Sequence, residues 1–509
     1  MVSKILSGAI IGVEGYIVSV EVDLAPGLPG VSIVGLPDSA VKESRERVQA
    51  AIKNSGYAFP VKRITVNLAP ADIRKEGPYF DLPIAVGILT CNGAIKPETT
   101  STVFLTGELS LDGSLRPVNG VLPMIYGAYK AGIKVCAVPL DNADEAALVK
   151  GMKVVPVGSL QEVIDYFKDP ASFNARETNA EQLLKNEDLF DLDFSEVKGQ
   201  ESVKRGLEIG AAGRHNLIVI GPPGSGKTMM AKRMPGILPD LSFEESIEVT
   251  KVYSVAGLVH DKNALVAKRP FRAPHHTISY SALVGGGRVP VPGEISLAHN
   301  GVLFLDELPE FHKNVLEVLR QPMEDGEVTI SRVNGTITYP SNFMLICSMN
   351  PCSCGHYPDR NKCSCTQADV ARYLNKVSGP LLDRIDIQLE APKIDYDDIG
   401  RTKSAESTAV IKKRVLTARS IQQKRYEDEN FTFNSDLPPA LIEKYCVLDI
   451  EGTNLLKNAF DSMGLSMRAY HKILKTARTI ADLDGGGNIS PMHIAEAIQY
   501  RSLDRKYWK

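Results

Sequence analysis

The hydrophobic and polar positions of the chain follow three successive patterns. Up to about residue 167, short β-rich runs such as YIVSVEVDL alternate with helical patterns such as SAVKESRERVQAAIKNSG. Between about 191 and 395, fully apolar runs end in polar residues, as expected of parallel strands that are buried on both faces. Beyond this point amphipathic helical patterns dominate, and Ser490 is expected as an N-cap before a proline at the first helical position.

These patterns predict a multidomain α/β protein. The polar, weakly patterned stretch that follows the first domain is typical of a linker. At 509 residues the chain is long enough for each domain to bury its own core. We predict an N-terminal α+β domain at 1–167, a linker at 168–190, a central α/β domain at 191–395 and a C-terminal helical domain at 396–509.

The most informative motif is LIVIGPPGSGKT, in which an apolar run leads into a glycine-rich loop and then a helix former. The glycines let successive N–H groups face a phosphate, while Lys227 can reach the β and γ oxygens. The helix that follows presents its N-terminus, which also favours an anion. The sequence therefore predicts an ATP site formed by Gly221, Pro222, Pro223, Gly224, Ser225, Gly226, Lys227 and Thr228.

A second apolar run, GVLFL, ends in Asp306 and Glu307. At the carboxyl end of a buried strand, Asp306 is expected to hold Mg²⁺ together with the Thr228 hydroxyl. Glu307 is expected to polarise the attacking water. Since this acid pair follows a P-loop, the sequence predicts ATP hydrolysis.

Two further segments extend this pattern. The run FMLICSM ends in Asn350, and GPLLDRID places Arg384 in an otherwise apolar context. P-loop, acid pair, Asn-tipped strand, late arginine and helical C-terminus, in this order, resemble the AAA+ ATPases. The resemblance implies that Asn350 is the first sensor, that Arg384 is an arginine finger for a neighbouring subunit, and that Arg468 is the sensor arginine of the helical lid. A finger supplied in trans implies a homo-oligomeric ring, expected to be a hexamer. A structural ion pair is the alternative for either arginine.

The stretch FRAPHHTISYSALVGGGRVPVPGEISLAHNGVLFLDELPEF resembles the magnesium-chelatase-like branch of AAA+ proteins, which carry an insertion in their second helix. With VDLAPGLPGVSIVGLPDSAVKESRERVQAAIKNSG, SMNPCSCG and GLSMRAYHKILKTARTIADL, the whole chain resembles the ComM/YifB family. The resemblance implies an ATP-driven branch-migration helicase for natural transformation, with single-stranded and branched DNA and recombination proteins as partners. The alternatives are a protein-remodelling chaperone and the motor subunit of a metal-insertion enzyme.

The N-terminal segments KEGPYFDLPIA, TGELSLDGSLRPVNG and AYKAGIKVCAVP resemble the proteolytic domain of Lon-type proteases, which has a ribosomal-S5-domain-2-like fold. Its chemistry needs a serine nucleophile with a lysine base in reach. Tyr79 stands in the place of the serine, and Leu122 stands in the place of the lysine. We predict a proteolytically inactive domain that binds a partner or supports oligomerisation.

Two arginines are candidate DNA contacts. The segment EVTISRVNGTITY alternates around an Asn-Gly pair, which predicts a β-hairpin. By the family resemblance this hairpin projects into a central pore with Arg332 near its tip, and the insertion adds Arg288 in GGGR. Because the net charge is -3, DNA binding requires local basic groups of this kind. The alternative is that both arginines are solvated loop residues.

Four of the eight cysteines lie in a C-x-C-x8-C-x-C pattern directly after Asn350. Their tight spacing suits four thiolate ligands of a structural Zn²⁺. Unliganded or redox-active thiols and an iron–sulfur cluster are the alternatives. His275 and His276 are expected to be insertion-loop residues and not metal ligands. The predicted zinc ligands are Cys352, Cys354, Cys363 and Cys365.

Composition limits the remaining classes. Hydrophobic residues make up 43% of the chain and charged residues 23%, which are ordinary values for a globular protein. No apolar stretch approaches the roughly eighteen residues that a membrane span needs, and the N-terminus lacks a cleavage-site pattern. We therefore expect a cytoplasmic protein without a membrane partner.

Overall fold

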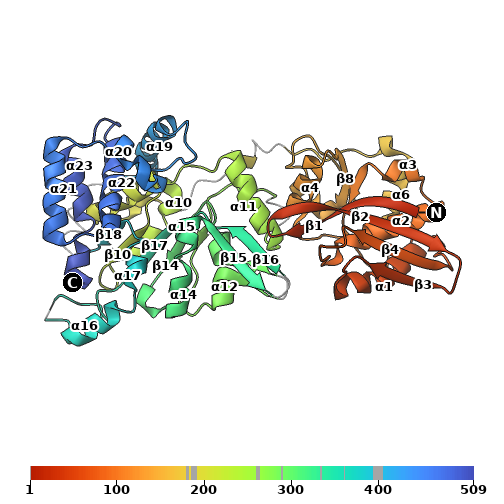
Figure 1. The fold of residues 1–509 in the computed structure, drawn as a ribbon, viewed down its shortest axis with the longest axis horizontal. Coiled ribbons are helices and arrows are strands. Elements are labelled where there is room, and N and C mark those ends of the chain that lie inside the picture. Colours follow the sequence, from red (N-terminus) through yellow and green to blue (C-terminus); the bar gives the residue numbers. More distant parts are fainter. Residues whose placement is uncertain are drawn as a thin grey trace.

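The computed structural model describes residues 2–178, 183–184, 192–259, 264–287, 290–332, 335–359, 361–393 and 405–508, without the side chains at 332, 335, 504 and 505. The N-terminal domain lies at one end of an elongated molecule, and the central sheet and C-terminal helices form the other end (Figure 1). Helix α11 and the β15–β16 hairpin lie between these two parts (Figure 1).

The N-terminal domain is built on a mixed seven-stranded sheet of order β3-β4-β2-β1-β5-β8-β9. β1, β2 and β4 pair antiparallel, whereas β3, β5, β8 and β9 join the sheet by parallel pairing. A small hairpin, β6 (Glu108–Leu109) with β7 (Leu115–Arg116), lies beside it. The sheet strands are β1 (Val2–Ile11), β2 (Glu14–Ala25), β3 (Gly30–Val34), β4 (Arg63–Ala69), β5 (Val103–Leu105), β8 (Val135–Pro139) and β9 (Lys153–Val157).

Helices cover both faces of this sheet. Along β5, Val103 and Leu105 belong to the core on one face, and Phe104 belongs to the core on the other. This alternation follows from the period of two along a strand. Helix α2 packs on the first face and α4 on the second. The helices are α1 (Ser39–Asn54), α2 (Asp81–Cys91), α3 (Pro97–Thr100), α4 (Val121–Lys130), α5 (Ala143–Ala146) and α6 (Leu160–Lys168).

The central domain contains a fully parallel five-stranded sheet of order β11-β14-β17-β10-β18. Every residue of β10, β14 and β17 is buried, which confirms the prediction of strands covered on both faces. The apolar run before the P-loop therefore forms a central strand of this sheet. The strands are β10 (Leu217–Ile220), β11 (Phe271–Arg272), β14 (Val302–Leu305), β17 (Met344–Met349) and β18 (Ile387–Glu390).

The remaining central elements include two short hairpins. β15 (Glu327–Arg332) pairs antiparallel with β16 (Gly335–Pro340), which confirms the predicted hairpin, although its tip lies outside the described residues. β12 (Gly285–Gly286) pairs with β13 (Val291–Pro292) within the insertion. The helices are α8 (Glu201–Gly213), α9 (Lys227–Ala231), α10 (Met234–Ile237), α11 (Phe243–Val255), α12 (Tyr280–Val284), α13 (Glu294–Leu297), α14 (Lys313–Val318), α15 (Pro322–Asp325), α16 (Gln367–Leu374) and α17 (Gly379–Leu382).

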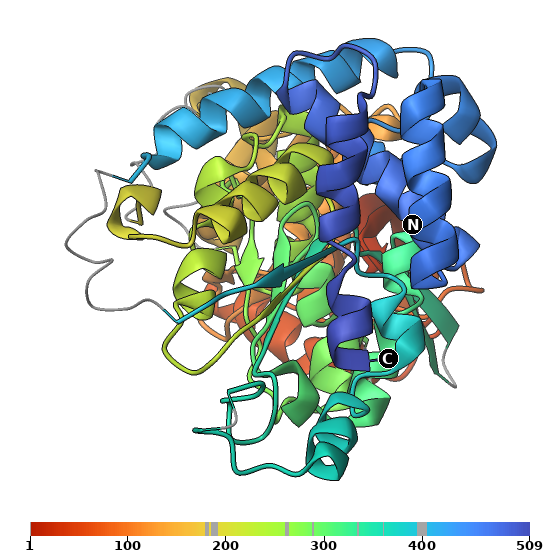
Figure 2. The ribbon, with the colours of Figure 1, turned by 90° about the vertical axis from the view of Figure 1, so that its left-hand side faces the viewer.

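The C-terminal helices pack over the central sheet (Figure 2). They share one hydrophobic core with α8, α10 and one face of that sheet. Ser490 is the N-cap of α23 and Pro491 its first residue, as predicted. Among the described residues no helix is both long and apolar enough to cross a membrane. The helices are α19 (Thr408–Arg425), α20 (Ile442–Tyr445), α21 (Ile450–Met463), α22 (Met467–Leu483) and α23 (Pro491–Gln499), with a final π-turn at Asp504–Trp508.

Helix α11 joins the N-terminal domain to the central domain. The Gly120 N–H at the start of α4 donates to the Ser254 carbonyl oxygen at 3.0 Å. The Ser254 hydroxyl donates to the buried Glu145 carboxylate, which also accepts the Leu122 N–H at 2.9 Å. On the other side of the junction the β1–β2 turn lies against β16, where a Cβ added to Gly12 would meet a backbone oxygen at 3.0 Å. The N-terminal domain is thus docked on the central domain.

A buried histidine connects the C-terminal helices to the central sheet. The His215 Nε2 lies 2.7 Å from Thr479 Oγ1, and its Nδ1 lies 3.9 Å from the carboxylate of Asp386. Lys472 of α22 pairs with the same carboxylate at 2.8 Å. Burial lowers the pKa of His215 to about 4.

We expect this histidine to make stability depend on pH. Its folded pKa of about 4 lies below the ordinary 6.5, so the unfolded chain binds the proton first as the pH falls. The free energy of unfolding has its full value above pH 6.5 and falls by up to about 3 kcal/mol between pH 6.5 and 4. Urea unfolding at pH 7 and pH 5 measures the loss. His215→Gln should be less stable at pH 7 and show a smaller loss; equal losses would contradict the assignment.

Candidate functional site

The glycine-rich loop takes the backbone shape that its glycines allow. Gly224 and Gly226 have φ of 77° and 85°, a region that favours glycine. A Cβ at Gly221 would lie 2.3 Å from the Ala391 carbonyl oxygen, so the loop can leave β10 only with a glycine there. The Ser225 hydroxyl is buried and has no hydrogen-bond partner among the described residues. The backbone shape of the loop therefore suits an anion, and the Ser225 hydroxyl is a hydrogen-bond donor for it.

The ammonium group of Lys227 lies directly over this loop. It donates to the carbonyl oxygens of Gly221 at 2.7 Å and Pro222 at 2.9 Å. It also donates to Asn350 Oδ1 at 3.2 Å, which brings two predicted site residues together at the carboxyl ends of β10 and β17. Burial lowers the pKa of Lys227, while the nearby carboxylates of Asp306 and Glu307 raise it.

The predicted Mg²⁺ ligands also meet. The Thr228 hydroxyl donates to Asp306 Oδ2 at 2.6 Å. The Ser348 hydroxyl donates to the other oxygen of the same carboxylate. Hydroxyl and carboxylate oxygens are the ligands that Mg²⁺ prefers, so Thr228 and Asp306 fit this ion. Ser348 was not predicted, because an interior strand serine gives no sequence signal.

Glu307 has a partner that the sequence did not reveal. Its Oε2 lies 3.4 Å from the Nδ1 of His276, whose ring is tilted by 34° against that of His275 with centroids 4.1 Å apart. The backbone of Glu307 has φ of 55°, a strained value for a non-glycine residue. The two histidines lie between β11 and α12, and His276 is placed to orient the carboxylate. This contact joins two segments that are separated in the sequence, and no local pattern predicts it.

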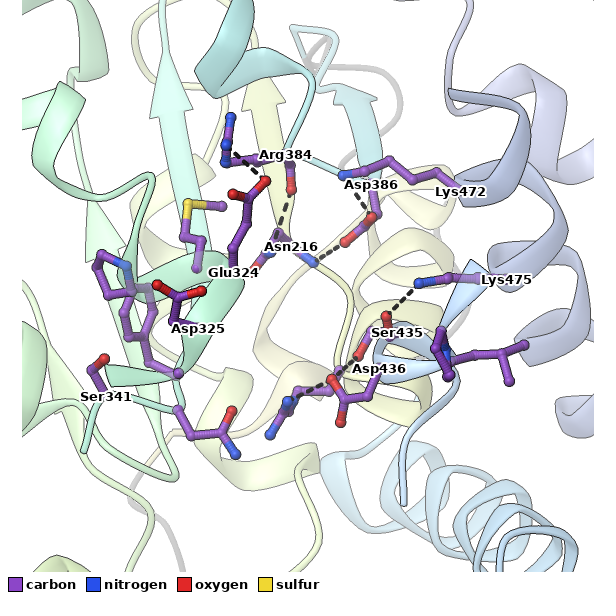
Figure 3. Close-up of a pocket in the computed structure, with 18 of the residues that line it drawn as sticks. Asn216, Glu324, Asp325, Ser341, Arg384, Asp386, Ser435, Asp436, Lys472 and Lys475 are labelled. Atoms are coloured by element: carbon purple, nitrogen blue, oxygen red, sulfur yellow. Dashed lines mark hydrogen bonds and ion pairs between the residues drawn. The ribbon is translucent and has the colours of Figure 1, made fainter. Parts of the chain in front are cut away.

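Arg384 and Arg468 converge on one carboxylate in a cavity of about 730 Å³. Arg384 Nη2 lies 2.7 Å and Arg468 Nη2 lies 2.9 Å from Glu324 Oε1. Figure 3 shows Glu324 pointing toward Arg384, with Lys472 and Asp386 farther along the same cavity. The Arg384 side chain is 9% exposed, and its Nε has no hydrogen-bond partner among the described residues. Glu324 therefore holds the two predicted arginines together.

This cavity lies at the opposite edge of the sheet from the P-loop. Its wall includes Asn216, Phe343 and Asp386, which come just before β10, β17 and β18. The P-loop follows the carboxyl end of β10, and a strand of four residues spans roughly 13 Å. Neither arginine therefore belongs to the P-loop cavity of its own chain.

The four predicted zinc ligands form one cluster. Their sulfur atoms all lie within 4.8 Å of one another. Cys352 Sγ lies 3.3 Å from Cys354 Sγ and 3.8 Å from Cys363 Sγ. Tetrahedral zinc with Zn–S bonds of about 2.3 Å places its sulfurs about 3.8 Å apart, so this cluster fits the ion. The His356 amide N–H lowers the pKa of the Cys354 thiol to about 6, which favours a thiolate ligand.

The cysteine loop touches the P-loop and the C-terminal end of the chain. A Cβ on Gly355 would lie 2.5 Å from Pro223 Cδ, so the two loops are in direct contact. The rings of Tyr357 and Tyr507 pack at 6.3 Å between centroids. Order in the cysteine loop therefore affects the position of the P-loop.

The other predicted residues are placed as follows. Arg332 ends β15 opposite Gly335, its side chain is not described, and Arg288 lies outside the described residues. Leu122 is buried in the first turn of α4. The Tyr79 ring packs on Gly77, and burial raises the pKa of its phenol. No serine–lysine dyad stands at these two N-terminal positions.

Family models cover most of the chain. "Magnesium chelatase, subunit ChlI" matches residues 193–399. "Subunit ChlI of Mg-chelatase" matches residues 20–142, and "Magnesium chelatase, subunit ChlI C-terminal" matches residues 405–501. The three matches follow the order of the N-terminal domain, the P-loop sheet and the C-terminal helices.

Individual proteins are similar over nearly the full length. YifB of Escherichia coli, called an uncharacterized protein, is 44% identical over 98% of this chain and 96% of its own. The competence protein ComM of Haemophilus influenzae is 43% identical over 98% of this chain and 97% of its own. Lon protease of Trichlorobacter lovleyi is 27% identical over 30% of this chain and 20% of its own.

Proposed function

The chain belongs to the magnesium-chelatase-like AAA+ family that includes YifB and ComM, and from this premise we propose that it is a ring-forming ATPase that drives branch migration of DNA. The observation that carries the proposal is the convergence of Lys227, Asn350, Thr228 and Asp306 around one glycine-rich loop. The name of the Haemophilus relative, a competence protein, favours DNA as the polymer on which the motor acts.

Each residue of the site has a role in ATP hydrolysis. The loop amides and Lys227 bind the triphosphate, and Asn350 holds Lys227 in place. Thr228 and Asp306 would hold Mg²⁺, which would neutralise charge on the phosphate oxygens. Glu307 orients and polarises the attacking water, and His276 positions the Glu307 carboxylate.

Assembly into a ring would bring to each P-loop the two arginines that its own chain does not place there. Arg384 and Arg468 lie at the amino edge of the sheet, and the P-loop lies at the carboxyl edge. A neighbouring subunit that docks its P-loop against the Glu324 cavity would receive both arginines. The Arg384 guanidinium, which Glu324 orients, would then donate to a phosphate oxygen. This arrangement supports a finger and a sensor that both act in trans.

DNA contacts in the pore are proposed for the two hairpins. The β15–β16 hairpin with Arg332 lies directly before β17, the strand that ends at Asn350. A change at the phosphate site can therefore reach this hairpin through one strand. The insertion hairpin with Arg288 is the second candidate. In a ring these arginines would form a basic collar for the DNA backbone.

We also propose a structural Zn²⁺ bound by the four clustered thiols. Zinc would fix a loop whose residues HYPDRNK offer little apolar surface for a core. Because Gly355 touches Pro223, the bound ion would also support the P-loop.

ATP hydrolysis should be stimulated by DNA. We expect phosphate release to rise with single-stranded DNA and further with a four-way junction, together with junction unwinding. Glu307→Gln should bind ATP but lose at least about 10²-fold in rate, because it removes the group that polarises water. Hydrolysis that is indifferent to DNA would contradict the motor, and a protein client should then be sought with the Glu307→Gln chain.

Rings assembled from two different variants test whether Arg384 acts on the neighbouring subunit. Lys227→Ala and Arg384→Ala chains should each be inactive, since a finger contributes about 10³–10⁵ in rate in other P-loop enzymes. Mixing the two should restore activity, because a chain with an intact P-loop then receives an arginine from its neighbour. Glu324→Gln should behave like Arg384→Ala, since it loses the carboxylate that orders both arginines. A Glu317→Gln chain is the matched control, and mixtures without any recovery would place the arginines in cis.

Zinc content tests the cysteine cluster. Protein purified without added metal should contain about one Zn²⁺ per chain, as a closed four-thiolate site holds one ion. The Cys363→Ser, Cys365→Ser double variant should lose the ion and show a raised KM for ATP, because the P-loop loses its support. Cys91→Ser in the N-terminal domain is the control and should retain the metal. Metal-free wild-type protein would overturn the site.

A further inference from the structure

A group of lysines stacks on aromatic rings where the N-terminal and central domains meet. Lys130 Nζ lies 4.6 Å from the centroid of the Tyr126 ring. Lys134 Nζ lies 3.9 Å above the Tyr129 ring. Lys150 completes the contacts, 5.0 Å from the ring of Phe243 on helix α11. Two of these rings belong to α4 and the third belongs to α11, and Figure 1 shows these two helices where the two domains meet.

These contacts form one continuous surface. Tyr126 and Tyr129 are neighbours on α4 because they are three residues apart. The Tyr129 phenol covers the turn after Lys150, where a Cβ on Gly151 would lie 2.9 Å from its oxygen. We call Lys130, Lys134, Lys150 and these rings the lysine–aromatic face.

The positive charge of this face is not neutralised. All three lysines are exposed. In the part of the chain that the structure describes, none of them makes an ion pair with a carboxylate. A fourth lysine beside the face, Lys251, lies 4.1 Å from the Tyr126 ring but pairs with Glu14 at 3.4 Å. Three lysines without a carboxylate partner on one surface contrast with the net charge of -3 for the chain.

We propose that the lysine–aromatic face binds the phosphate backbone of DNA, outside the pore and on both domains at once. The proposal rests on the proposed DNA motor and adds a binding surface made of described residues, separate from Arg288 and Arg332. The rings hold the lysine stems in place through cation–π contacts, so the ammonium groups are presented together.

The chemistry of the face favours nucleic acid over an acidic protein. Ammonium groups on flexible stems are point charges that suit phosphates without regard to sequence. The ammonium groups lie over the aromatic rings, so the face presents positive charge at its rings. DNA held here would contact α11, which follows the P-loop helix in the central domain, and α4 of the N-terminal domain. One bound strand would then contact both domains, so its binding would depend on their relative position.

The test compares two full-length variants with the same change in charge. Lys130, Lys134 and Lys150 are replaced by Gln in the first, and the exposed Lys42, Lys53 and Lys62 of the same domain in the second. Binding of a fluorescein-labelled DNA duplex is followed by anisotropy over a salt series. Each phosphate contact contributes about 0.9 to the slope of log K against log salt, so the first variant should lose up to about 2.7 in slope. The second should bind like the wild type.

Further measurements separate the outcomes. Basal ATP hydrolysis without DNA should be unchanged in both variants, which shows that they fold. Replacing the first three lysines by Arg should restore binding, because the charge returns. If the first variant binds like the wild type, or if both variants weaken equally, the proposal is wrong while the motor stands. If the wild type binds no DNA, both proposals fail. If only an acidic protein binds through the three lysines, the DNA assignment is overturned.

Discussion

The direction of the buried parallel sheet is the constraint on which the rest of the structure depends. All five strands run the same way, so their carboxyl ends meet at one edge and their amino ends at the other. The first edge holds Lys227, Thr228 and Asp306, and the second holds Arg384 beside Glu324. Because the strands are buried on both faces, neither edge can be moved without disrupting the core. One chain therefore carries two groups of candidate site residues that face in opposite directions.

The N-terminal domain is tied to this sheet through α11. A serine near the end of α11, Ser254, is held by the buried Glu145 carboxylate and by the Gly120 N–H. Leu122 donates its N–H to the same carboxylate. The position at which the resemblance to Lon-type proteases places a catalytic lysine thus lies next to a structural connection between two domains.

Local motifs could be predicted from the sequence, and long-range partners could not. Neighbouring residues determine the P-loop, the strand that ends at Asn350 and the β15–β16 hairpin. Their spacing fixes both the backbone conformation and the chemistry of each motif. The four cysteines could be grouped for the same reason. His276 beside Glu307 and Glu324 between two arginines bring together distant segments, and ordinary charged residues at such positions look like solvated surface. The sequence also separated the C-terminal helices from the central domain, whereas the structure gives them one common core, because α8 carries apolar residues for both.

This common core limits how the molecule can be divided. A fragment that ended after β18 would expose the apolar residues with which α8 and α10 meet α19 and α22. Exposed apolar area of this kind promotes aggregation. The C-terminal helices expressed alone would lack the other half of the same interior. The P-loop sheet and the helices should therefore be resistant to protease as one unit, with cleavage concentrated elsewhere, and truncation studies of either part would report misfolding instead of function.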